Sequence, residues 1–495
     1  MTVTPDYDAI IVGAGFGGMG AAIQLNRLGI TNLVILERED DLGGTWHVNR
    51  YPGLAVDIAS VTYSYSFEPN PYWSRLFAPG AELKRYAEHV ADKYRLRRHM
   101  RFGTVVDGAT WDDRAQAWTV RVRGGERLTA RYLVTATGFL SQPRMPDIAG
   151  IDTFTGKVIH STAWDDGYDL TGRRAAVIGT GATAVQLVPE VASQVAELTV
   201  YQRTPIWVTP KLDGPIPRPL QRLFARVPLA QRIARLLNTA ALEAIMVTGV
   251  LHYRHAQLMN RGAERLARAH LRRQIRDPEL RRKLTPDYSF GCKRPTFSND
   301  YFPTFNKPNV HLETTPIDHV EPTAIVTTDG RRTEIDTLLL ATGFNLWDVN
   351  FPAIEITGRE SRDLGSWWRA NRFQAYEGVT IPYFPNLISL NSPYSYSGLS
   401  YFTTIEAQMR HMARLFGELR RRDVTTFEVK QAANDDFLAK MRARLGDSVF
   451  ELGSCSTARS YYFNQHGEPA LLRPTSTLNA RRAAATFPVT DYAYA

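Results

Sequence analysis

Short apolar runs and helical periodicity alternate in two separate parts of the chain. Residues 8–12 form a mostly apolar run, which is typical of a parallel strand buried on both faces. Residues 19–28 follow with helical spacing, and residues 33–36 form a second apolar run. The same order recurs with apolar runs at 175–178 and 198–202. This succession predicts an α/β fold with two Rossmann-like dinucleotide-binding domains.

Glycines lie at the turn that joins strand to helix in the first unit. Gly13 permits a tight turn, Gly15 lets the backbone approach a pyrophosphate, and Gly18 permits close packing of helix on strand. The free N–H groups at the start of the helix favour an anion. Glu37, nineteen residues after Gly18, suits a ribose diol and repels a 2′-phosphate. The unit is therefore expected to bind a dinucleotide with an unphosphorylated adenosine ribose.

The second unit carries a related turn and the opposite charge. Gly179, Thr180 and Gly181 form the turn, and Ala184 stands in place of the third glycine. Arg203 lies nineteen residues after Ala184, at the end of the following strand. Because a guanidinium can bind a phosphate through two parallel hydrogen bonds, Arg203 predicts NADPH as the ligand. An arginine with an ordinary structural role is the alternative.

A further repeat relates the two units. Residues 132–139 and 337–344 are both apolar runs that end in Ala-Thr-Gly-Phe, and one follows each glycine motif. Such a pair is expected of two related domains. A flavin and a nicotinamide on one chain would allow a hydride to pass from NADPH to FAD.

Residues 154–165 carry a pattern that resembles a known family. Phe154, Gly156, His160 and Trp164 match the FxGxxxHxxxW fingerprint of class I Baeyer–Villiger monooxygenases at every fixed position. The related flavin-containing N- and S-oxygenases usually end this pattern in Tyr or Phe, so Trp164 favours the first family. By this resemblance His160 acts through domain positioning and is no catalytic base. A structural linker between two domains is the alternative for this segment.

Two more segments resemble the same family. Residues 43–57 are similar to its GGxWxxNxYPGxxxD stretch beside the flavin, and residues 291–295 to its G-x-K-R-x turn. The resemblance implies that Arg294 is the active-site arginine, Asp57 its carboxylate partner, and Lys293 a second contact to the NADPH 2′-phosphate. A structural ion pair between domains is the alternative for Asp57 and Arg294. Further residues expected to line the cofactor sites are Thr45, Trp46, Asn49, Tyr63, Val106, Gln186 and Thr204.

The resemblance implies a domain plan and a reaction. The FAD domain is expected from residues 1–145 and 345–495, the NADPH domain from 155–210 and 290–344, and a helical insert from 211–289. With FAD and NADPH bound, the enzyme would insert one oxygen atom of O2 next to a ketone carbonyl. The product would be an ester or lactone, formed through a flavin C4a-peroxide. The permanent charge of Arg294 suits an oxyanion. The alternatives are an N- or S-oxygenating monooxygenase and an NADPH oxidase or redox-sensing flavoprotein.

Positive charge is concentrated in the insert. The formal net charge is +9, and residues 254–283 hold ten Lys/Arg against three Asp/Glu. No aromatic residues interleave with the arginines, which disfavours a nucleic-acid site. A solvated basic face is expected, with its opposite helix face formed by Leu251, Leu258, Leu266, Leu271 and Ile275. A weak association with anionic membrane surfaces is the alternative.

Membrane, disulfide and targeting signals are expected to be absent. No apolar run reaches the roughly 18 residues that a bilayer-spanning helix needs, and residues 236–251 indicate a buried or interfacial helix. Cys292 and Cys455 form no CxxC motif and no disulfide framework, so Cys292 is expected to be an inert packing residue in a reducing compartment. Neither a metal site nor a signal peptide is expected, and the predicted location is the cytoplasm. The sequence gives no indication of the oligomeric state.

Overall fold

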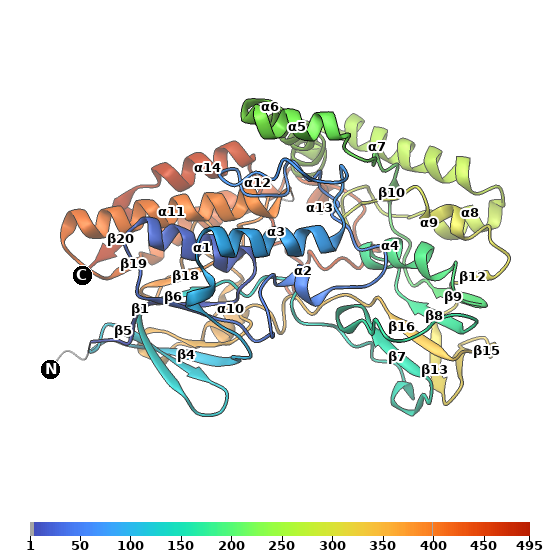
Figure 1. Ribbon diagram of the computed structural model, residues 1–495, viewed down its shortest axis with the longest axis horizontal. Helices are drawn as coiled ribbons and strands as arrows, with labels where there is room; N and C mark the ends of the chain where they lie inside the picture. Colours follow the sequence, from blue (N-terminus) through green and yellow to red (C-terminus); the bar gives the residue numbers. More distant parts are fainter. Residues whose placement is uncertain (1–3, 398) are drawn as a thin grey trace.

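The computed structural model describes residues 4–397 and 399–495, and its two main sheets lie at opposite ends of the long axis (Figure 1). The strands and helices of the chain ends surround the first sheet. Those of the middle of the chain surround the second. Helices from residues 218–274 cover the top of the molecule in the view of Figure 1.

The first sheet combines a parallel half with an antiparallel half. Its strand order is β17-β4-β5-β6-β1-β2-β3, and β18 pairs with the far part of β6. Strand β1 lies parallel between β2 and β6, which explains its almost continuous burial. The eight strands are β1 (Tyr7–Val12), β2 (Leu33–Leu36), β3 (Met100–Arg101), β4 (Val106–Asp112), β5 (Ala117–Val122), β6 (Arg127–Thr135), β17 (Glu355–Thr357) and β18 (Leu387–Ser389).

Helices from both ends of the chain cover this sheet. Helix α1 (Phe16–Arg27) crosses α11 (Tyr401–Arg422) closely, because a Cβ at Gly20 would lie only 2.7 Å from the side chain of Ile405. The C-terminal part of the chain is therefore an integral part of the first unit. The other helices here are α2 (Thr45–Val48), α3 (Gly80–Lys93), α10 (Leu364–Asn371), α12 (Gln431–Leu445), α13 (Val449–Leu452) and α14 (Thr477–Thr486), and β19 (Phe427–Val429) pairs with β20 (Tyr492–Tyr494).

The second sheet is entirely parallel, with the order β12-β9-β8-β16-β7. Helix α4 (Ala182–Val191) follows β8 just as α1 follows β1, so the two glycine turns occupy equivalent places. The strands are β7 (Lys157–His160), β8 (Arg174–Ile178), β9 (Glu197–Tyr201), β12 (Val310–Glu313) and β16 (Thr337–Leu340), and a small antiparallel sheet contains β13 (Ile317–Glu321), β14 (Ala324–Thr327) and β15 (Arg332–Glu334).

The helices of the insert form the upper layer in Figure 1. They are α5 (Arg218–Arg226), α6 (Pro228–Leu242), the π-helical continuation η4 (Glu243–Leu251), α7 (Tyr253–Gln274) and α8 (Pro278–Leu284), flanked by the pair β10 (Val208–Thr209) and β11 (Thr296–Phe297) and by α9 (Tyr301–Thr304). The expectation of one buried leucine face on α7 is wrong in part. Leu251, Leu271 and Ile275 are buried, but Leu258 and Leu266 are exposed. At about 100° per residue, Leu271 lies about 140° round the helix from Leu266, so these leucines do not share one face.

The expectation that no helix reaches bilayer-spanning length is also wrong. Helix α6 continues without a break into η4, which gives an apolar helix of 24 residues, Pro228–Leu251, with a mean hydropathy of 1.4. Only 17% of its most apolar stretch is buried, so the buried alternative for residues 236–251 does not hold for the helix as a whole.

Two connecting segments join the sheets and are bonded to each other. Pro143 and Phe344 form an antiparallel bridge. The amide of Arg144 donates to the carbonyl of Gly343 at 2.9 Å, and the amide of Asn345 donates to the carbonyl of Gln142 at 2.9 Å. The chain thus crosses between the two units as a short two-stranded ribbon.

Cys292 and Cys455 are joined by a disulfide, contrary to the expectation of two unpaired cysteines. The bond was not foreseen because 163 residues separate the two cysteines in the sequence. The fold brings them together by packing the turn at 289–292 against residues 449–455, where the amide of Ser289 donates to the carbonyl of Ser454 at 3.0 Å. Cys292 is fully buried, so it packs as expected but is bonded rather than free.

Candidate active site

A cavity of about 1950 Å³ extends between the two glycine turns. Drug-sized ligand pockets in proteins measure roughly 300–1,000 Å³, so this volume suits two large ligands placed side by side. The cavity wall includes Gly13 and Gly15 from the first unit, Gly179 and Gly181 from the second, and Arg294 from the turn after the insert.

The first glycine turn is shaped by close backbone contacts. Gly13 has a φ of +107°, and a Cβ there would lie 2.6 Å from the carbonyl oxygen of Ala136. A Cβ on Gly18 would lie 1.9 Å from the carbonyl oxygen of Gly13, so only glycine allows α1 to start this close to the strand. Gly18 therefore acts through packing, outside the cavity wall, whereas Gly13 and Gly15 lie in it.

Glu37 is held by the same turn. It follows β2, is almost fully buried, and accepts a hydrogen bond from the amide of Ala14 through Oε2 at 2.6 Å. Its Oε1 accepts a second bond from the amide of Glu39 at 3.0 Å. The carboxylate is thus fixed beside the glycine turn on the cavity wall, where a ribose diol could reach it.

The second turn repeats this geometry. Gly179 has a φ of +119°, and a Cβ there would lie 2.3 Å from the carbonyl oxygen of Ala341. A Cβ on Gly181 would meet no described atom within 4 Å, which leaves the start of α4 open toward the cavity. The hydroxyl of Thr180 donates to the carbonyl of Thr204 at 2.7 Å and ties the turn to the end of β9.

Four cations gather beyond this turn. Arg203, Lys293, Arg144 and Arg459 all line the cavity, and none of them forms an ion pair within residues 4–397 and 399–495. Burial, together with the charge of Arg203, lowers the pKa of Lys293 to about 8. Burial and the charges of Arg459 and Arg144 lower the pKa of Arg203. Such uncompensated positive charge is what a multiply charged anion would neutralise.

Arg294 and Asp57 meet in the cavity, as the resemblance implied. Arg294 Nε donates to Asp57 Oδ2 at 2.7 Å, and the two side chains retain only 19% and 30% of their exposure. Burial alone would lower the pKa of Arg294, but the attraction of Asp57 prevails and holds it well above its ordinary value. The guanidinium therefore keeps its charge throughout the range in which proteins are stable.

Tyr396 is a third member of this group, and the sequence did not single it out. Arg294 Nη1 donates to the Tyr396 hydroxyl at 2.9 Å, and that hydroxyl donates to the carbonyl of Leu399 at 2.7 Å. The C-terminal tail, which had no predicted role, positions this tyrosine, since the amide of Arg473 donates to the Tyr396 carbonyl at 2.8 Å. Arg144 and Arg459 were not predicted from the sequence either, because they lie in segments without a motif.

The remaining predicted cofactor residues divide into two groups. Thr45, Trp46, Asn49, Tyr63, Val106 and Thr204 lie on the cavity wall, but Ala184 and Gln186 do not. Ala184 is fully buried in the second core. Gln186 instead bridges the two units, because it accepts from the Tyr51 hydroxyl at 3.0 Å and donates to the carbonyl of Ala55 at 2.9 Å.

The fingerprint residues lie away from the cavity wall. Phe154 and Trp164 are buried in two different hydrophobic clusters, and a Cβ on Gly156 would lie 2.4 Å from the carbonyl oxygen of Asp336. His160 is buried at the end of β7, where Nδ1 interacts with the Thr162 hydroxyl at 2.8 Å and burial lowers its pKa. This placement fits a positioning role and a structural linker equally, and it keeps the four residues out of the cavity wall.

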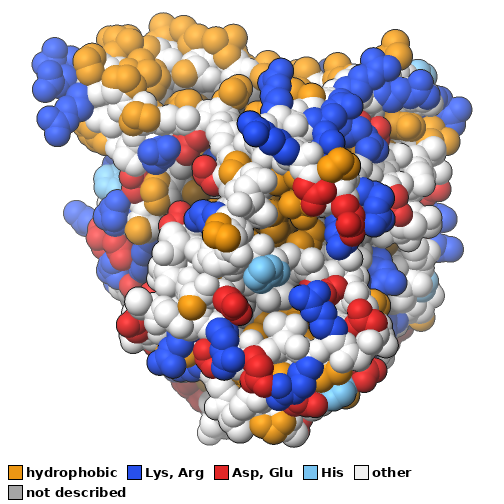
Figure 2. Space-filling view, turned by 90° about the vertical axis from the view of Figure 1, so that its right-hand side faces the viewer, with side chains coloured by type: hydrophobic (Ala, Val, Ile, Leu, Met, Phe, Trp, Pro, Cys, Tyr) orange, Lys and Arg blue, Asp and Glu red, His pale blue; other side chains and the backbone are white. Residues whose placement is uncertain are grey.

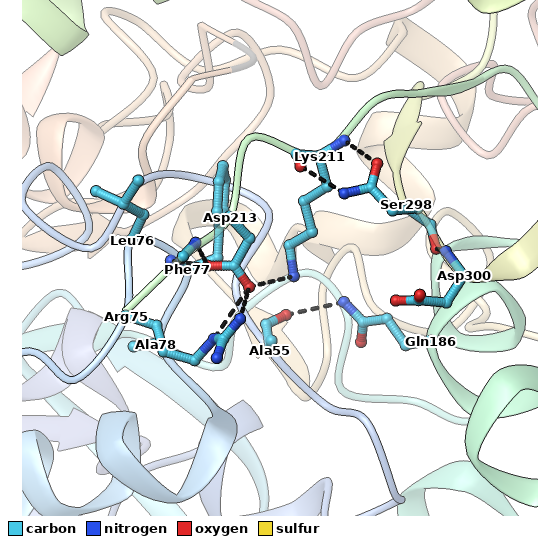
Figure 3. Close-up of polar contacts among 12 residues, drawn as sticks. Ala55, Arg75, Leu76, Phe77, Ala78, Gln186, Lys211, Asp213, Ser298 and Asp300 are labelled. Atoms are coloured by element: carbon cyan, nitrogen blue, oxygen red, sulfur yellow. Dashed lines mark hydrogen bonds and ion pairs between the residues drawn. The ribbon is translucent and has the colours of Figure 1, made fainter. Parts of the chain in front are cut away.

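Polar contacts fasten the start of the insert, before α5 in the sequence, to the first unit (Figure 3). Asp213 accepts from Arg75 at 3.1 Å and from the amide of Phe77 at 3.3 Å. Lys211 lies 3.7 Å from the same carboxylate, and its amide donates to Asn299 at 3.0 Å. Together with the bond from Gln186 to Ala55, these contacts join the first unit, the start of the insert and the second unit.

Comparison with known proteins places the chain among flavoproteins. Residues 10–221 match the family model described as pyridine nucleotide-disulphide oxidoreductase. A Baeyer–Villiger monooxygenase of Streptomyces coelicolor is 38% identical over 97% of this chain and 91% of its own length. A Baeyer–Villiger monooxygenase of Pseudomonas aeruginosa is also 38% identical, over 97% of this chain and 90% of its own length. A crystal structure of OTEMO in complex with FAD and NADP superposes with a TM-score of 0.88 at 28% identity, over all of both chains.

Two glycine turns facing one cavity, one beside a carboxylate and one beside a cluster of cations, define a protein with two dinucleotide-binding domains, and its relatives make it a flavoprotein monooxygenase. Within that class, the chain belongs to the Baeyer–Villiger monooxygenases. The predictions of the fold class, the family and an FAD- and NADPH-dependent monooxygenase are confirmed.

Proposed function

We propose that this protein inserts one oxygen atom of O2 next to the carbonyl of a small-molecule ketone, giving an ester or lactone and consuming NADPH. The observation that carries the proposal is the position of Arg294 on the wall of a cavity that both glycine turns share. Asp57 and Tyr396 occupy its Nε and Nη1 and so fix the plane of the guanidinium. Its other terminal nitrogen is not used by either partner.

The first glycine turn, Glu37, Thr45, Trp46, Asn49, Tyr63 and Val106 would hold FAD. The second turn, Thr180, Thr204, Arg203 and Lys293 would hold NADPH. Their placement around one cavity supports this assignment, as does the fit of Glu37 to a ribose diol and of the cation cluster to a 2′-phosphate. Bound FAD, once reduced by NADPH, would supply the activation of O2. We propose the same division for the domains, with residues 1–145 and 345–495 in the FAD domain and residues 155–210 and 290–344 in the NADPH domain.

Arg294 would stabilise the negative charge that develops on oxygen as the carbonyl is attacked. A fixed cation in a partly dry site contributes roughly 3–4 kcal/mol to such a step when compared with oxyanion donors in other enzymes. The ion pair with Asp57 orients the charge before the substrate arrives, so little reorganisation is needed at the moment of reaction.

The test is the variant Arg294→Ala, compared with the wild type and with Arg114→Ala, an exposed arginine in the turn between β4 and β5. We expect Arg294→Ala to retain FAD absorbance and to form no ester from a panel of cyclic and linear ketones. Arg114→Ala should match the wild type. Ester formation at the wild-type rate by Arg294→Ala would contradict the assignment.

The alternative chemistries are separated by measuring thioether oxygenation and hydrogen peroxide beside ester formation. Oxygenation of a thioether with no ester from any ketone would favour an N- or S-oxygenating enzyme. NADPH consumption that yields only hydrogen peroxide across the panel would favour an oxidase. We also propose the cytoplasm as the location, because it supplies the NADPH that the reaction consumes. Disulfides are rare in that reducing compartment, so burial of Cys292 would have to shield the bond to Cys455 there.

A further inference from the structure

Helix α6 presents its apolar side to solvent. Leu229, Ile233, Leu236 and Leu237 are 62%, 50%, 67% and 66% exposed. Their spacing places them on one stripe along the helix. Surface helices of globular proteins normally bury such a stripe, so this arrangement needs a partner that the chain itself does not supply.

The polar side of α6 is fixed against the first unit. Gln231 donates to the carbonyl of Asn70 at 2.7 Å, and Arg235 donates to the carbonyl of Ser64 at 2.8 Å. Asn238 donates to the hydroxyl of Thr62 at 2.7 Å. These contacts extend over about two turns of the helix and prevent it from rotating its leucines inward.

The apolar stripe extends onto the neighbouring helices. Large exposed side chains on α5 and η4 continue it, and Figure 2 shows hydrophobic side chains gathered along the upper edge of the molecule, over the insert. We call this surface the leucine face and define it by Leu220, Leu223, Val227, Leu229, Ile233, Leu236, Leu237 and Ile245.

Positive charge accompanies the leucine face. Residues 218–242 hold five arginines and no acidic residue. Arg235 is turned inward, and the exposed Arg218, Arg222, Arg226 and Arg232 lie on the same two helices as the leucines. Leucines flanked by arginines on one surface are the composition of helices that lie in the interface of an anionic bilayer.

We propose that the leucine face docks onto an anionic lipid bilayer, with the leucines in the acyl boundary and the arginines at the headgroup phosphates. The 24-residue helix Pro228–Leu251 is long enough to cross a membrane. Its polar contacts with residues 62–70 hold it along the protein surface, so it lies in the interface rather than across it.

A second copy of the chain fits this surface less well. In a twofold dimer the same patch meets itself, so the four exposed arginines would approach an identical set with no acidic residue between 218 and 242 to compensate. Like charges in apposition oppose such an interface. An anionic bilayer instead accepts both the leucines and the arginines.

The test uses the purified full-length holoenzyme in vesicle co-sedimentation. The vesicles are pure phosphatidylcholine, or phosphatidylcholine with 30% phosphatidylglycerol. We expect binding to the anionic vesicles, at least tenfold weaker binding to neutral ones, and a further loss as salt rises from 50 to 300 mM. The triple variant Leu229→Ser/Leu236→Ser/Leu237→Ser should lose at least tenfold in partitioning. Since these side chains are exposed, circular dichroism should stay unchanged.

A second variant and a control separate the two contributions. Arg222→Ala/Arg226→Ala should weaken binding to anionic vesicles and remove most of its salt dependence. Val158→Ser, an exposed apolar residue on β7 of the second sheet, should behave as the wild type. Equal partitioning of wild type and triple variant would overturn the proposal. So would a solution dimer, seen by sedimentation velocity without lipid, that the triple variant dissociates.

Discussion

Replacing Asp57 by Asn removes the charge next to Arg294 and leaves a side chain of nearly the same shape. Loss of one partner from a buried ion pair costs 3–5 kcal/mol in proteins. Asp57 and Arg294 keep 30% and 19% of their exposure, so solvent screening reduces the expected cost to about 2–3 kcal/mol. If Arg294 must be oriented for the reaction, that cost appears in the rate of ester formation as about a 30- to 150-fold loss.

The assay is steady-state ester formation by gas chromatography at saturating NADPH, with FAD content measured by absorbance. Tyr396→Phe is the matched variant, because it removes a hydrogen bond to the same guanidinium without removing a charge. A bond between a charged donor and a neutral acceptor contributes at least about 1.5 kcal/mol, so about a 12-fold loss is expected. Asp436→Asn, in an exposed ion pair with Lys440, should leave the rate unchanged. A wild-type rate for Asp57→Asn at full FAD content would refute the view that the carboxylate orients Arg294.

Three further predictions concern the cation cluster and the disulfide. Because burial and Arg203 lower the pKa of Lys293 to about 8, the lysine loses its charge as pH rises through 8, and kcat/KM for NADPH should fall between pH 7 and 9. Arg203→Ala should raise KM for NADPH by about 10- to 150-fold, since a charge-assisted bond to phosphate is worth about 1.5–3 kcal/mol, while KM for NADH stays unchanged. Removing the disulfide with Cys292→Ala/Cys455→Ala should lower the free energy of unfolding by about 2–5 kcal/mol in denaturant titrations.

Each of these three predictions has an outcome that would contradict it. For the pH profile, Lys293→Met should abolish the decline above pH 8, and an unchanged decline would assign it to another group. For Arg203→Ala, an equal rise in KM for both nucleotides would place the arginine away from the 2′-phosphate. For the cysteines, thiol titration of the denatured wild type should find no free thiol, and two free thiols would contradict the bond.

The sequence predicted the parts of the fold that depend on short-range pattern. The second strand of the first unit was placed at 33–36 and is observed as Leu33–Leu36, because a parallel strand buried on both faces must be continuously apolar. The glycine turns were predicted for the same kind of reason, since Gly13 and Gly18 each adopt a geometry that a Cβ would forbid. The Asp57–Arg294 contact came from the family resemblance, across 237 residues that no local pattern could bridge.

What the sequence did not predict depends on long-range packing. The spacing of Leu229, Ile233 and Leu236 defines a stripe on a helix, but only the contacts of Arg235 and Asn238 determine that the stripe points outward. The 163-residue separation concealed the disulfide. Tyr396 lies in a loop without periodicity, and its place beside Arg294 depends on the bond from the Arg473 amide.

The paired connectors between the sheets limit how the two units can move. A ribbon of two bonded strands bends readily across its flat face, whereas sliding one strand past the other would break the bonds of Arg144 and Asn345 together. Of these two movements the ribbon therefore allows a swing, which would also have to break the bonds that join Gln186 to Tyr51 and Ala55. Such a swing would open or narrow the gap between the turns at Gly13 and Gly179 while each sheet keeps its own hydrogen bonds.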